Sequence, residues 1–548
     1  MKRLAALLLA ALLMLSGAAM ATELPIMPEM VHLTLGVDGN AATGDPEDLW
    51  FWEFCRQAMN IDFDVEVTLE RANYVSLAFA SDNVPDVLLA GLQSADIVRY
   101  GMEQGMLLDI SPYINEEYMP YLSAMLDEHP EWRDQLKTPD GAIYSLPKIS
   151  NFSTIEGLCM VGIRGWYFIN SVWLDELGLE YPTTLDELYD VLAAFKEAYP
   201  DCIPLGGSYN SSVNPGYLIL NALGYTGTDN SGYTVSLRDG EVVFPFGDRE
   251  VFPAYLEIMN QYYEEGLIDP EFFTADNTAV NAKMAEGRLG IIPGALDGGL
   301  KEGSNFKDYW SFAPLTSEYK SEPSWGRNND GLSVGNFSIS AKCENVEAAV
   351  RFADWFYKPD STNSLLAWIG PTADQTDMLY GKTTGYDFDI NSKSRVYRDV
   401  TNGKWATVGE LVQGEVAGFT ERIGYVGHKT YAGFALSGNA DLYSELVYDG
   451  TNCDQPWQWM RYAMQENQME YCVADYPPIV FLTEEENTLV ADYKVQLENY
   501  ATQEIAKFIT GARELNDDEL NNYFDTLDGM GFQEYLGIYA DYYAKITG

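Results

Sequence analysis

The chain has 548 residues, of which 47% are apolar and 21% are charged. This composition is that of an ordinary globular protein and excludes disorder for most of the chain. The length requires two or more lobes, at about 100–200 residues per domain. The 33 basic residues face 83 acidic ones, which gives a net charge of −50. Because a surface this acidic repels phosphate backbones, nucleic-acid binding is excluded.

The N-terminal segment has the three parts of a secretory signal peptide. Lys2 and Arg3 form a basic start, residues 4–15 form an apolar run, and residues 19–21 supply the small-x-small pattern of a cleavage site. The apolar run is too short to span a bilayer. We therefore predict that the signal peptide, residues 1–21, is removed and that the mature chain is exported to the extracellular side or the cell surface.

Residues 15–18 resemble a bacterial lipobox in which Ala18 stands where the lipidated cysteine would be. Without that thiol no diacylglycerol can be attached, so we expect the exported protein to lack a lipid anchor. Six cysteines lie elsewhere, none of them in a CxxC motif: Cys55, Cys159, Cys202, Cys343, Cys453 and Cys472. An even number in an exported protein is compatible with disulfides. A chain of this size does not need them, and we expect mostly free, buried thiols.

The predicted elements alternate along the chain. Alternating apolar residues predict strands at 31–37 and 61–69, and a helix that starts at Asp45 and Pro46 lies between them, so a parallel βαβ unit is expected. Further on, the pattern predicts strands at 86–90, 288–294 and 333–340 and helices at 185–195, 281–287 and 347–357. A capping box at 483–486 opens a long helical region rich in tyrosine and acid. This alternation indicates an α/β fold with at least two lobes.

Six motifs follow one another in an order that is typical of one family. They lie at 84–87 (VPDV), 105–114 (GMLLDISPYI), 144–147 with 167–170 (YSLP and YFIN), 174–179 with 182–188 (LDELGL and PTTLDEL), 284–290 (MAEGRLG) and 341–352 (AKCENVEAAVRF). Together they resemble the extracellular solute-binding proteins (family 1) of bacterial ABC importers, which include maltose-binding protein. The tail resembles the long-chain Gram-positive branch, with GLIDPE at 266–271, two prolines at 477–478 and AKFITG at 506–511.

The resemblance implies a two-lobed α/β fold of the periplasmic-binding-protein type (type II) with a helical C-terminal extension. It assigns residues 22–150 to the first lobe, 151–325 to the second, 326–370 to a return into the first, and 371–548 to second-lobe helices and the extension. An uncharged carbohydrate, expected to be an oligosaccharide, would bind in the cleft between the lobes, which would close by hinge bending. The implied partners are the permease subunits of an ABC importer. We expect a monomer with no catalytic activity, cofactor or metal.

Candidate ligand-binding residues follow from the chemistry of a sugar, which needs flat aromatic faces and polar groups that pair with its hydroxyls. Loops at the C-terminal ends of parallel strands collect such groups. We predict the site residues to be Asp38, Asn40, Gln93, Trp166, Tyr167, Asp297, Trp325, Arg327 and Asn328. Asp38 and Asn40 are equally typical of a turn, and Trp166 and Tyr167 have apolar neighbours that suit a core. Trp325 lies in a polar stretch that would not bury an indole for core reasons.

A secreted glycoside hydrolase is the main alternative, because such enzymes are often acidic and aromatic-rich and need two facing carboxylates. The ordered motifs, and the lack of eight repeating βα units, favour binding over hydrolysis. A third alternative is a module that presents a bound ligand to a surface sensor, which would share the fold. The GLSVG motif at 331–335 resembles a nucleophile elbow, but strand-like sequence follows Ser333 where a helix is required. The P-loop-like residues 381–383 and the EF-hand-like start at 387–391 each lack required positions.

Overall fold

The computed structural model contains two compact units. Unit 1 comprises residues 1–156, 331–446 and 479–484, and unit 2 comprises residues 157–330, 447–478 and 485–548. The structure describes residues 24–38, 50–68, 70–89, 91–150, 165–209, 211–301, 303–327, 332–359 and 450–547 apart from 452, 454 and 478, with short pieces at 363, 386–388, 396–399, 405–407 and 437–438. Strands alternate with helices in both units, which confirms the predicted α/β class.

Unit 1 is built on a six-stranded sheet with the order β16-β4-β12-β3-β1-β2. Its strands are β1 (Val31–Asp38), β2 (Ile61–Thr68), β3 (Val87–Leu89), β4 (Leu146–Ser150), β12 (Leu332–Ile339) and β16 (Ser437–Gly438). β1 runs parallel to β2 and β3, whereas β12 runs antiparallel to β3 and β4. In β1, Leu33 and Leu35 are buried and His32 is exposed, which is the predicted alternation. The parallel βαβ unit is thereby confirmed.

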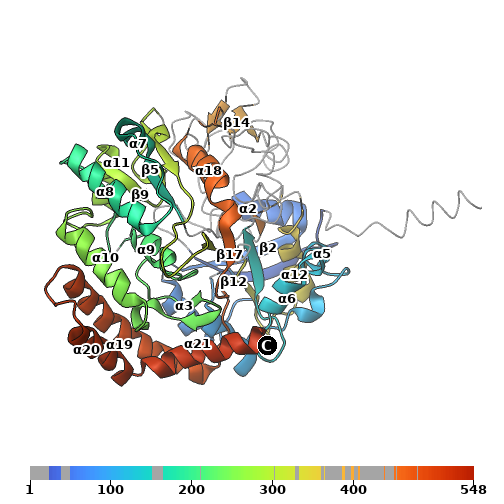
Figure 1. Ribbon diagram of the computed structural model, residues 1–548. Coiled ribbons are helices and arrows are strands. Elements are labelled where there is room, and N and C mark those ends of the chain that lie inside the picture. The colour runs from blue at the N-terminus through green and yellow to red at the C-terminus, as the bar shows by residue number, and fades with distance from the viewer. Residues whose placement is uncertain are drawn as a thin grey trace, which may run out of the picture. The chain divides into compact units, whose positions relative to one another are not determined.

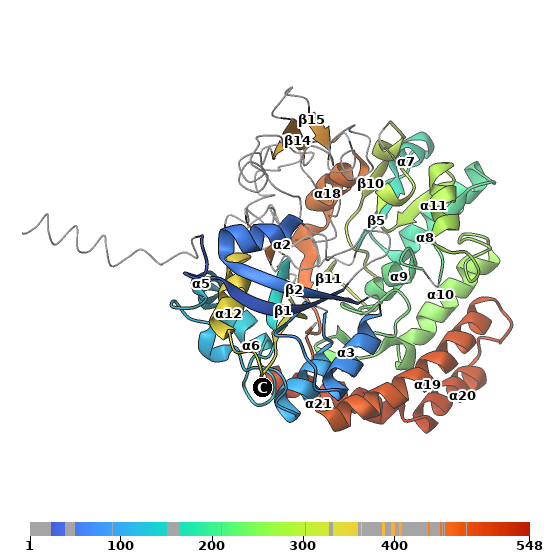
Figure 2. The same ribbon diagram turned by 180° about the vertical axis from the view of Figure 1, so that it is seen from behind.

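Aromatic rings join the helices of unit 1 to its sheet. The helices are α2 (Trp50–Phe54), α3 (Arg71–Ala80), α4 (Ser94–Asp96), α5 (Pro120–Glu128), α6 (Pro130–Gln135) and α12 (Val346–Trp355). The ring of Phe51 in α2 lies 6.0 Å from that of Trp355 in α12, measured between centroids. Phe352 of α12 lies 4.9 Å from Phe63 of β2. These contacts hold α2 and α12 close to β1 and β2, as Figure 2 shows.

One strand of unit 1 differs from what sequence alone suggested, and another, β12, agrees with it. β16 pairs in parallel with β4, so residues 437–438 extend the sheet of unit 1, whereas we expected everything from residue 371 onward in the second lobe. A two-residue strand carries no periodic signal that assigns it to a lobe. Ser333 lies inside β12, which continues to Ile339 as a strand. No helix follows the serine, so the nucleophile-elbow interpretation fails on geometry.

Unit 2 contains a four-stranded sheet with the order β10-β5-β9-β6. Its strands are β5 (Tyr167–Asn170), β6 (Ile203–Leu205), β9 (Leu289–Pro293) and β10 (Tyr309–Ser311), and two small pairings add β7 (Ser236–Arg238) with β8 (Glu241–Val243) and β11 (Trp325–Arg327) with β17 (Cys472–Ala474). β9 runs parallel to β6 and antiparallel to β5. The carboxyl ends of β6 and β9 therefore meet the start of β5 at one edge of the sheet.

The helices of unit 2 follow local sequence signals. They are α7 (Ser171–Leu177), α8 (Leu185–Ala198), α9 (Gly216–Ala222), α10 (Phe252–Glu264), α11 (Asn277–Ala285), α18 (Pro456–Asn467), α19 (Glu484–Ile509), α20 (Asp517–Gly529) and α21 (Phe532–Thr547). α8 begins at the N-cap Thr184, whose hydroxyl accepts from the Glu187 N–H at 3.1 Å, and the Glu187 carboxylate in turn accepts from the Thr183 N–H at 2.8 Å. Leu188, Leu192 and Phe195 lie on one face of α8 and are fully buried in the core.

The C-terminal helices are part of unit 2, and the predicted helical character of this region is confirmed. The side-chain amide of Asn260 in α10 donates to the carbonyl oxygens of Phe508 and Ile509 in α19, at 3.3 and 3.1 Å. The hydroxyl of Tyr523 in α20 donates to the carbonyl of Phe246 at 2.9 Å. Figure 1 shows α19 and α20 side by side, next to α10. The C-terminal helices are therefore attached by hydrogen bonds to α10 and to the segment around Phe246.

The described cysteines are free thiols, as predicted. Cys55, Cys202, Cys343 and Cys453 are buried and Cys472 is half-buried, whereas Cys159 lies outside the described residues. Burial raises the pKa of the Cys55 thiol well above its ordinary value. Within the described ranges, no helix is long and apolar enough to cross a membrane. The same ranges hold no group of three or more His, Cys, Asp or Glu side chains suited to a metal ion.

Lys320 gives unit 2 a testable pH dependence. Its ammonium donates to Asn221 Oδ1 at 2.8 Å and to the Ser324 carbonyl at 2.7 Å, and burial lowers its pKa to about 7. The unfolded value is about 10.4, so the folded state binds fewer protons between these two pH values and stability rises with pH across that window. We expect Lys320→Met to remove this slope. From about pH 6 to 8 to 10, the melting temperature of the wild type should rise relative to that of the variant. A difference between the two melting temperatures that does not change with pH would contradict the assignment.

Candidate ligand-binding site

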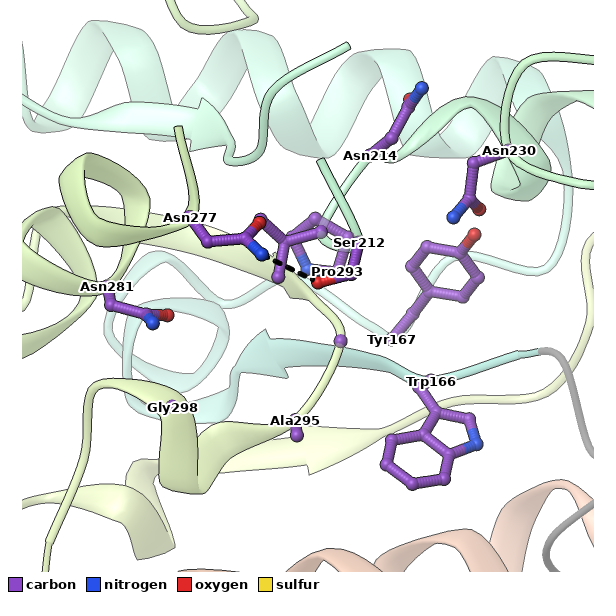
Figure 3. A pocket seen from close by; sticks show the side chains of 12 residues that line it. Trp166, Tyr167, Ser212, Asn214, Asn230, Asn277, Asn281, Pro293, Ala295 and Gly298 are labelled. Carbon is purple, nitrogen blue, oxygen red and sulfur yellow. Dashed lines mark hydrogen bonds between the residues drawn. The ribbon is translucent and has the colours of Figure 1, made fainter. Parts of the chain in front are cut away.

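A pocket opens in unit 2 where β6 and β9 end and β5 begins (Figure 3). Its cavity volume is about 360 Å³, and it is lined by Trp166, Tyr167, Ser212, Val213, Asn214, Asn230, Asn277, Asn281, Pro293, Gly294, Ala295 and Gly298. This volume lies at the small end of the range for sites that bind small molecules, about 300–1,000 Å³. The carboxyl ends of parallel strands are where α/β proteins bind ligands. We name this cavity the unit 2 pocket.

The antiparallel pairing of β5 with β9 fixes the floor of the pocket. Tyr167 stands opposite Pro293, and the N–H of Gly294 donates to the Trp166 carbonyl at 2.6 Å. Gly294 has a φ of +107°, and a Cβ at this position would lie 2.9 Å from Val213 Cγ1. Glycine is therefore required both by the left-handed backbone and by the close approach of the loop that carries Val213.

The loop after β6 is held by buried side-chain hydrogen bonds. Asn214 is 1% exposed; its amide donates to the Tyr209 carbonyl at 2.8 Å, and its Oδ1 accepts from the Gly216 N–H at 2.8 Å. The hydroxyls of Tyr209 and Tyr233 share a hydrogen bond of 2.8 Å, and Tyr233 shares another of 2.9 Å with Thr502 of α19. Asn214 thus orders the backbone of this loop, and the C-terminal helix α19 supports it from behind.

Helix α11 presents two asparagines to the pocket. Asp276 caps the helix by accepting from the Ala279 N–H at 2.9 Å. Asn277 and Asn281 are four residues apart and so lie on one face of the helix. The Asn277 amide donates to Ser212 Oγ at 3.1 Å, the contact drawn in Figure 3. The helix predicted at 281–287 begins earlier, at residue 277, because Asp276 caps it there. The prediction did not take Asp276 into account as a cap.

An ion pair anchors the other end of α11. The Lys283 ammonium lies 2.7 Å from a carboxylate oxygen of Asp269 and 2.7 Å from one of Glu271. Asp269 is 1% exposed. Burial alone would lower the pKa of Lys283, but its hydrogen bonds to the two carboxylates, together with their charges, raise it. The pair therefore stays charged and keeps α11 in place against the loop after residue 268.

Trp325 lies directly behind the pocket. Its side chain is fully buried; its ring stacks on Tyr167 with centroids 5.7 Å apart and contacts the ring of Tyr217 in a tilted arrangement at 5.8 Å. Gly165 leaves room for the indole, since a Cβ there would lie 2.5 Å from Cε2 of the ring. Burial raises the pKa of Tyr167 well above its ordinary value, so the phenol stays neutral. Trp325 therefore supports a lining residue from the core side.

The structure brings together some of the predicted site residues. Trp166 and Tyr167 both line the unit 2 pocket. Asp297 is exposed beside it, between Ala295 and Gly298, and its carbonyl accepts from the Lys301 ammonium at 2.8 Å. Trp325 is buried, so the expectation that its polar neighbours would leave the indole uncovered was wrong. The flanking β11 strand pairs with β17 and places Trp325 inside unit 2 regardless of the polar residues around it.

The remaining predicted residues do not belong to the described lining of the unit 2 pocket. Gln93 is exposed in unit 1, where its backbone N–H donates to the Asp96 carboxylate at 3.0 Å at the start of α4. Asp38 ends β1 and Arg327 ends β11, but their side chains lie outside the described part of the structure. Asn40 and Asn328 lie wholly outside it. For these residues the ligand-binding role stays a prediction.

Sequence reasoning missed the polar lining residues other than the aromatic pair. The overlooked side chains are Ser212, Asn214, Asn230, Asn277 and Asn281. The i, i+4 spacing of Asn277 and Asn281 after the cap Asp276 was a usable signal. The three-residue strand β6 gave none, because so short an apolar run has no periodicity. Figure 3 shows Asn230 pointing toward the Tyr167 hydroxyl and Asn281 entering the pocket from α11.

The chemistry of this lining is that of neutral hydrogen bonding. An asparagine amide offers two donors and one acceptor oxygen, and a serine hydroxyl offers both functions. The side-chain amides of Asn230 and Asn281 have no hydrogen-bond partner among the described residues. No carboxylate belongs to the described lining, so a pair of acids for glycosidic hydrolysis is not formed by it. Such a surface can bind hydroxyls in any arrangement that matches its geometry.

Comparison with known proteins places the chain among transport proteins. A family model described as bacterial extracellular solute-binding protein matches residues 50–363. The fructooligosaccharide ABC transporter substrate-binding protein FusA of Streptococcus pneumoniae is 26% identical over 502 residues, which cover 88% of this chain and 85% of FusA. These relatives are substrate-binding proteins of transporters and not enzymes.

Solved structures share the fold. FusA in complex with kestose has a TM-score of 0.67 at 22% identity, covering 94% of this chain and 99% of the FusA chain. An extracellular solute-binding protein from Bifidobacterium longum subsp. infantis has a TM-score of 0.72 at 20% identity, covering 95% of this chain and 99% of its own. The predicted two-lobed solute-binding fold is thereby confirmed.

Proposed function

Since the chain belongs to the bacterial extracellular solute-binding proteins, we propose that its unit 2 pocket binds part of an oligosaccharide reversibly for import by an ABC transporter. The observation that carries the proposal is the lining of the pocket, which combines asparagine amides and a serine hydroxyl with the rings of Trp166 and Tyr167. Sugar hydroxyls need donors and acceptors at short range, and the C–H faces of sugar rings pack on aromatic rings. The fructooligosaccharide and kestose named for the FusA relative have this chemistry.

Binding without turnover follows from the same residues. A glycosidase needs two carboxyl groups about 5–10 Å apart on either side of the scissile bond. The described lining offers amides in their place, which neither protonate a leaving group nor attack an anomeric carbon. The pocket therefore holds its ligand chemically unchanged, in keeping with the transport role of the family.

Partners and location extend the proposal. The permease subunits of an ABC importer would receive the ligand, and the protein would act as an exported monomer without a lipid anchor. Support comes from the family and from the sequence of residues 1–23, which lie outside the described residues. Intact-mass analysis of the exported protein should give a chain that begins at Thr22. A mass increased by a diacylglyceryl group would contradict it.

A thermal-shift screen of the full chain tests the function. We propose a panel of kestose, nystose, maltotriose and mannotriose. A ligand that binds the native state stabilises it by RT ln(1 + [L]/Kd), about 2.7 kcal/mol at a hundredfold excess over Kd. At least one member should raise the melting temperature in a saturable way, and a reducing-sugar assay on the same samples should detect no products. Absence of any shift, or accumulation of products, would contradict the proposal.

Asn281→Ala tests the site itself. Losing one hydrogen-bonding side chain should weaken binding of the best panel member by about 3- to 10-fold, the equivalent of about 0.5–1.5 kcal/mol. The matched control is Asn521→Ala on the exposed face of α20, which should leave affinity unchanged. Titration calorimetry measures both. Equal affinities for the two variants would remove Asn281 from the site.

A further inference from the structure

We propose that the unit 2 pocket selects uncharged carbohydrates and rejects acidic ones, such as oligosaccharides that contain uronic acid, and that Asn230, Asn277 and Asn281 are the residues that set this selectivity. The inference rests on the proposed function and assigns to particular residues the preference for an uncharged ligand, which until this point was only implied by the family resemblance. It follows from three features of the described residues: a neutral lining, an ammonium group on α11 that already has carboxylate partners, and acidic residues that directly precede two of the asparagines.

The first feature is the lining. The side chains around the cavity are three kinds of neutral group, namely aromatic rings, the amides and hydroxyl already described, and small apolar groups. Neither a guanidinium nor an ammonium is among these described lining residues. Binding a carboxylate in such a cavity removes it from water without supplying a counter-charge, which is unfavourable. An asparagine amide can donate to a carboxylate, but a neutral donor replaces only part of the lost hydration.

The second feature is that the nearby ammonium groups have other partners. Lys283 on α11 is held at 2.7 Å by both Asp269 and Glu271. Lys301, which follows the lining segment 294–298, is exposed, donates to the Asp297 carbonyl at 2.8 Å and is not among the described lining residues. Lys283 could turn to a ligand only by leaving a buried carboxylate without its partner, which is itself strongly unfavourable.

The third feature is a pair of acids next to the lining asparagines in sequence. Asp229 precedes Asn230, and its carboxylate accepts from the N–H groups of Ser231 and Tyr233 at 3.2 and 2.8 Å. Asp276 precedes Asn277 and caps α11. Both carboxylates are fixed by backbone donors, so they stay beside the pocket and repel an anionic ligand. At both positions the acid orders the backbone, and the asparagine that follows it lines the pocket.

Matched sugars separate charge from shape. Each neutral sugar of the panel is compared with its derivative oxidised at the primary hydroxyls to carboxylates, and with the methyl ester of that derivative, which is neutral again. We expect the oxidised form to bind at least about tenfold more weakly than the neutral sugar, and the ester to recover most of the loss. Binding is measured at about 0.15 and 0.5 M NaCl. Salt screens the long-range repulsion between the ligand and the net charge of −50, but it does not reduce the unfavourable free energy of burying an unpaired carboxylate in the pocket.

The outcomes are distinct. If the neutral and oxidised sugars bind equally, or only the oxidised sugar binds, the selectivity inference falls and the proposed function stands. If the ester stays as weak as the acid, or if the deficit disappears at high salt, local charge is not the cause and the inference also falls. If no sugar of any form binds, the proposed function itself fails.

A charge-gain variant tests the residues. Asn281→Lys places an ammonium at the pocket, and we expect the oxidised sugar to bind it at least about fivefold more tightly than it binds the wild type. Asn521→Lys makes the same change in net charge on the exposed face of α20 and should produce no gain. Equal gains in both variants, or none in Asn281→Lys, would contradict the assigned role.

Discussion

Trp325→Ala is expected to lower the free energy of unfolding by about 3–5 kcal/mol, as large-to-small changes of a buried tryptophan do, and to weaken oligosaccharide binding by more than about tenfold. The indole is fully buried, stacks on Tyr167 and contacts the tilted ring of Tyr217. Removing it leaves a cavity directly behind a lining residue, so Tyr167 loses its support. The effect on affinity is thus transmitted through Tyr167, not through contact with the sugar.

Denaturant unfolding and titration calorimetry measure the two effects separately. Trp325→Phe is the matched variant, because it keeps an aromatic ring against Tyr167. It sacrifices no hydrogen bond, since the buried indole N–H has no partner within the described structure. It should retain affinity within about threefold of the wild type. If Trp325→Ala binds sugar as tightly as the wild type, the supporting role is wrong.

Lys283→Met is expected to cost about 3–5 kcal/mol of stability, because it leaves Asp269 as a buried carboxylate without its charged partner. The folded pKa of Lys283 lies above its unfolded value, so its contribution is fully present below about pH 10.4 and is lost only as pH rises through the folded pKa. The deficit of the variant should therefore be constant between about pH 6 and 9. Affinity should fall as well, because α11 carries Asn277 and Asn281.

The control for Lys283→Met is Lys301→Met. Lys301 is exposed and donates to a carbonyl oxygen, so its loss should change stability by less than about 0.5 kcal/mol. Urea unfolding of both variants across the pH range gives the comparison. Similar deficits in the two variants would show that the buried ion pair does not hold α11.

Much of the fold could be predicted because its signals are local. The alternation in β1, the N-cap at Thr184 and the apolar face of α12 are each set by residues within a few positions of one another. The strands β6 and β16 escaped prediction because runs of two or three residues carry no periodicity. Their position depends on the partner strands, which lie far away in sequence.

The site was harder to predict than the fold. Trp166 and Tyr167 were found because aromatic residues are informative in a sugar-binding context, whereas the asparagines looked like ordinary loop residues. Trp325 shows the opposite error. Its sequence neighbours are polar, but Gly165 and Tyr217, both distant in sequence, form the cavity that buries it. Tertiary contacts decide whether a side chain is buried, and the polarity of its neighbours in the sequence does not predict those contacts.

Hinge closure of the two lobes stays a prediction from the family resemblance. Small-angle scattering of the full chain, with and without a panel sugar at saturation, tests it. A smaller radius of gyration in the presence of sugar is expected. Identical profiles at a concentration shown by calorimetry to saturate the protein would contradict closure.

The most direct test of the whole account is calorimetry of the full chain with the panel sugars, followed by mass spectrometry of the sugar recovered after the titration. We expect saturable heat for at least one neutral oligosaccharide and recovery of that sugar at its original mass. Shorter sugars in the recovered sample, or no heat with any member of the panel, would contradict it.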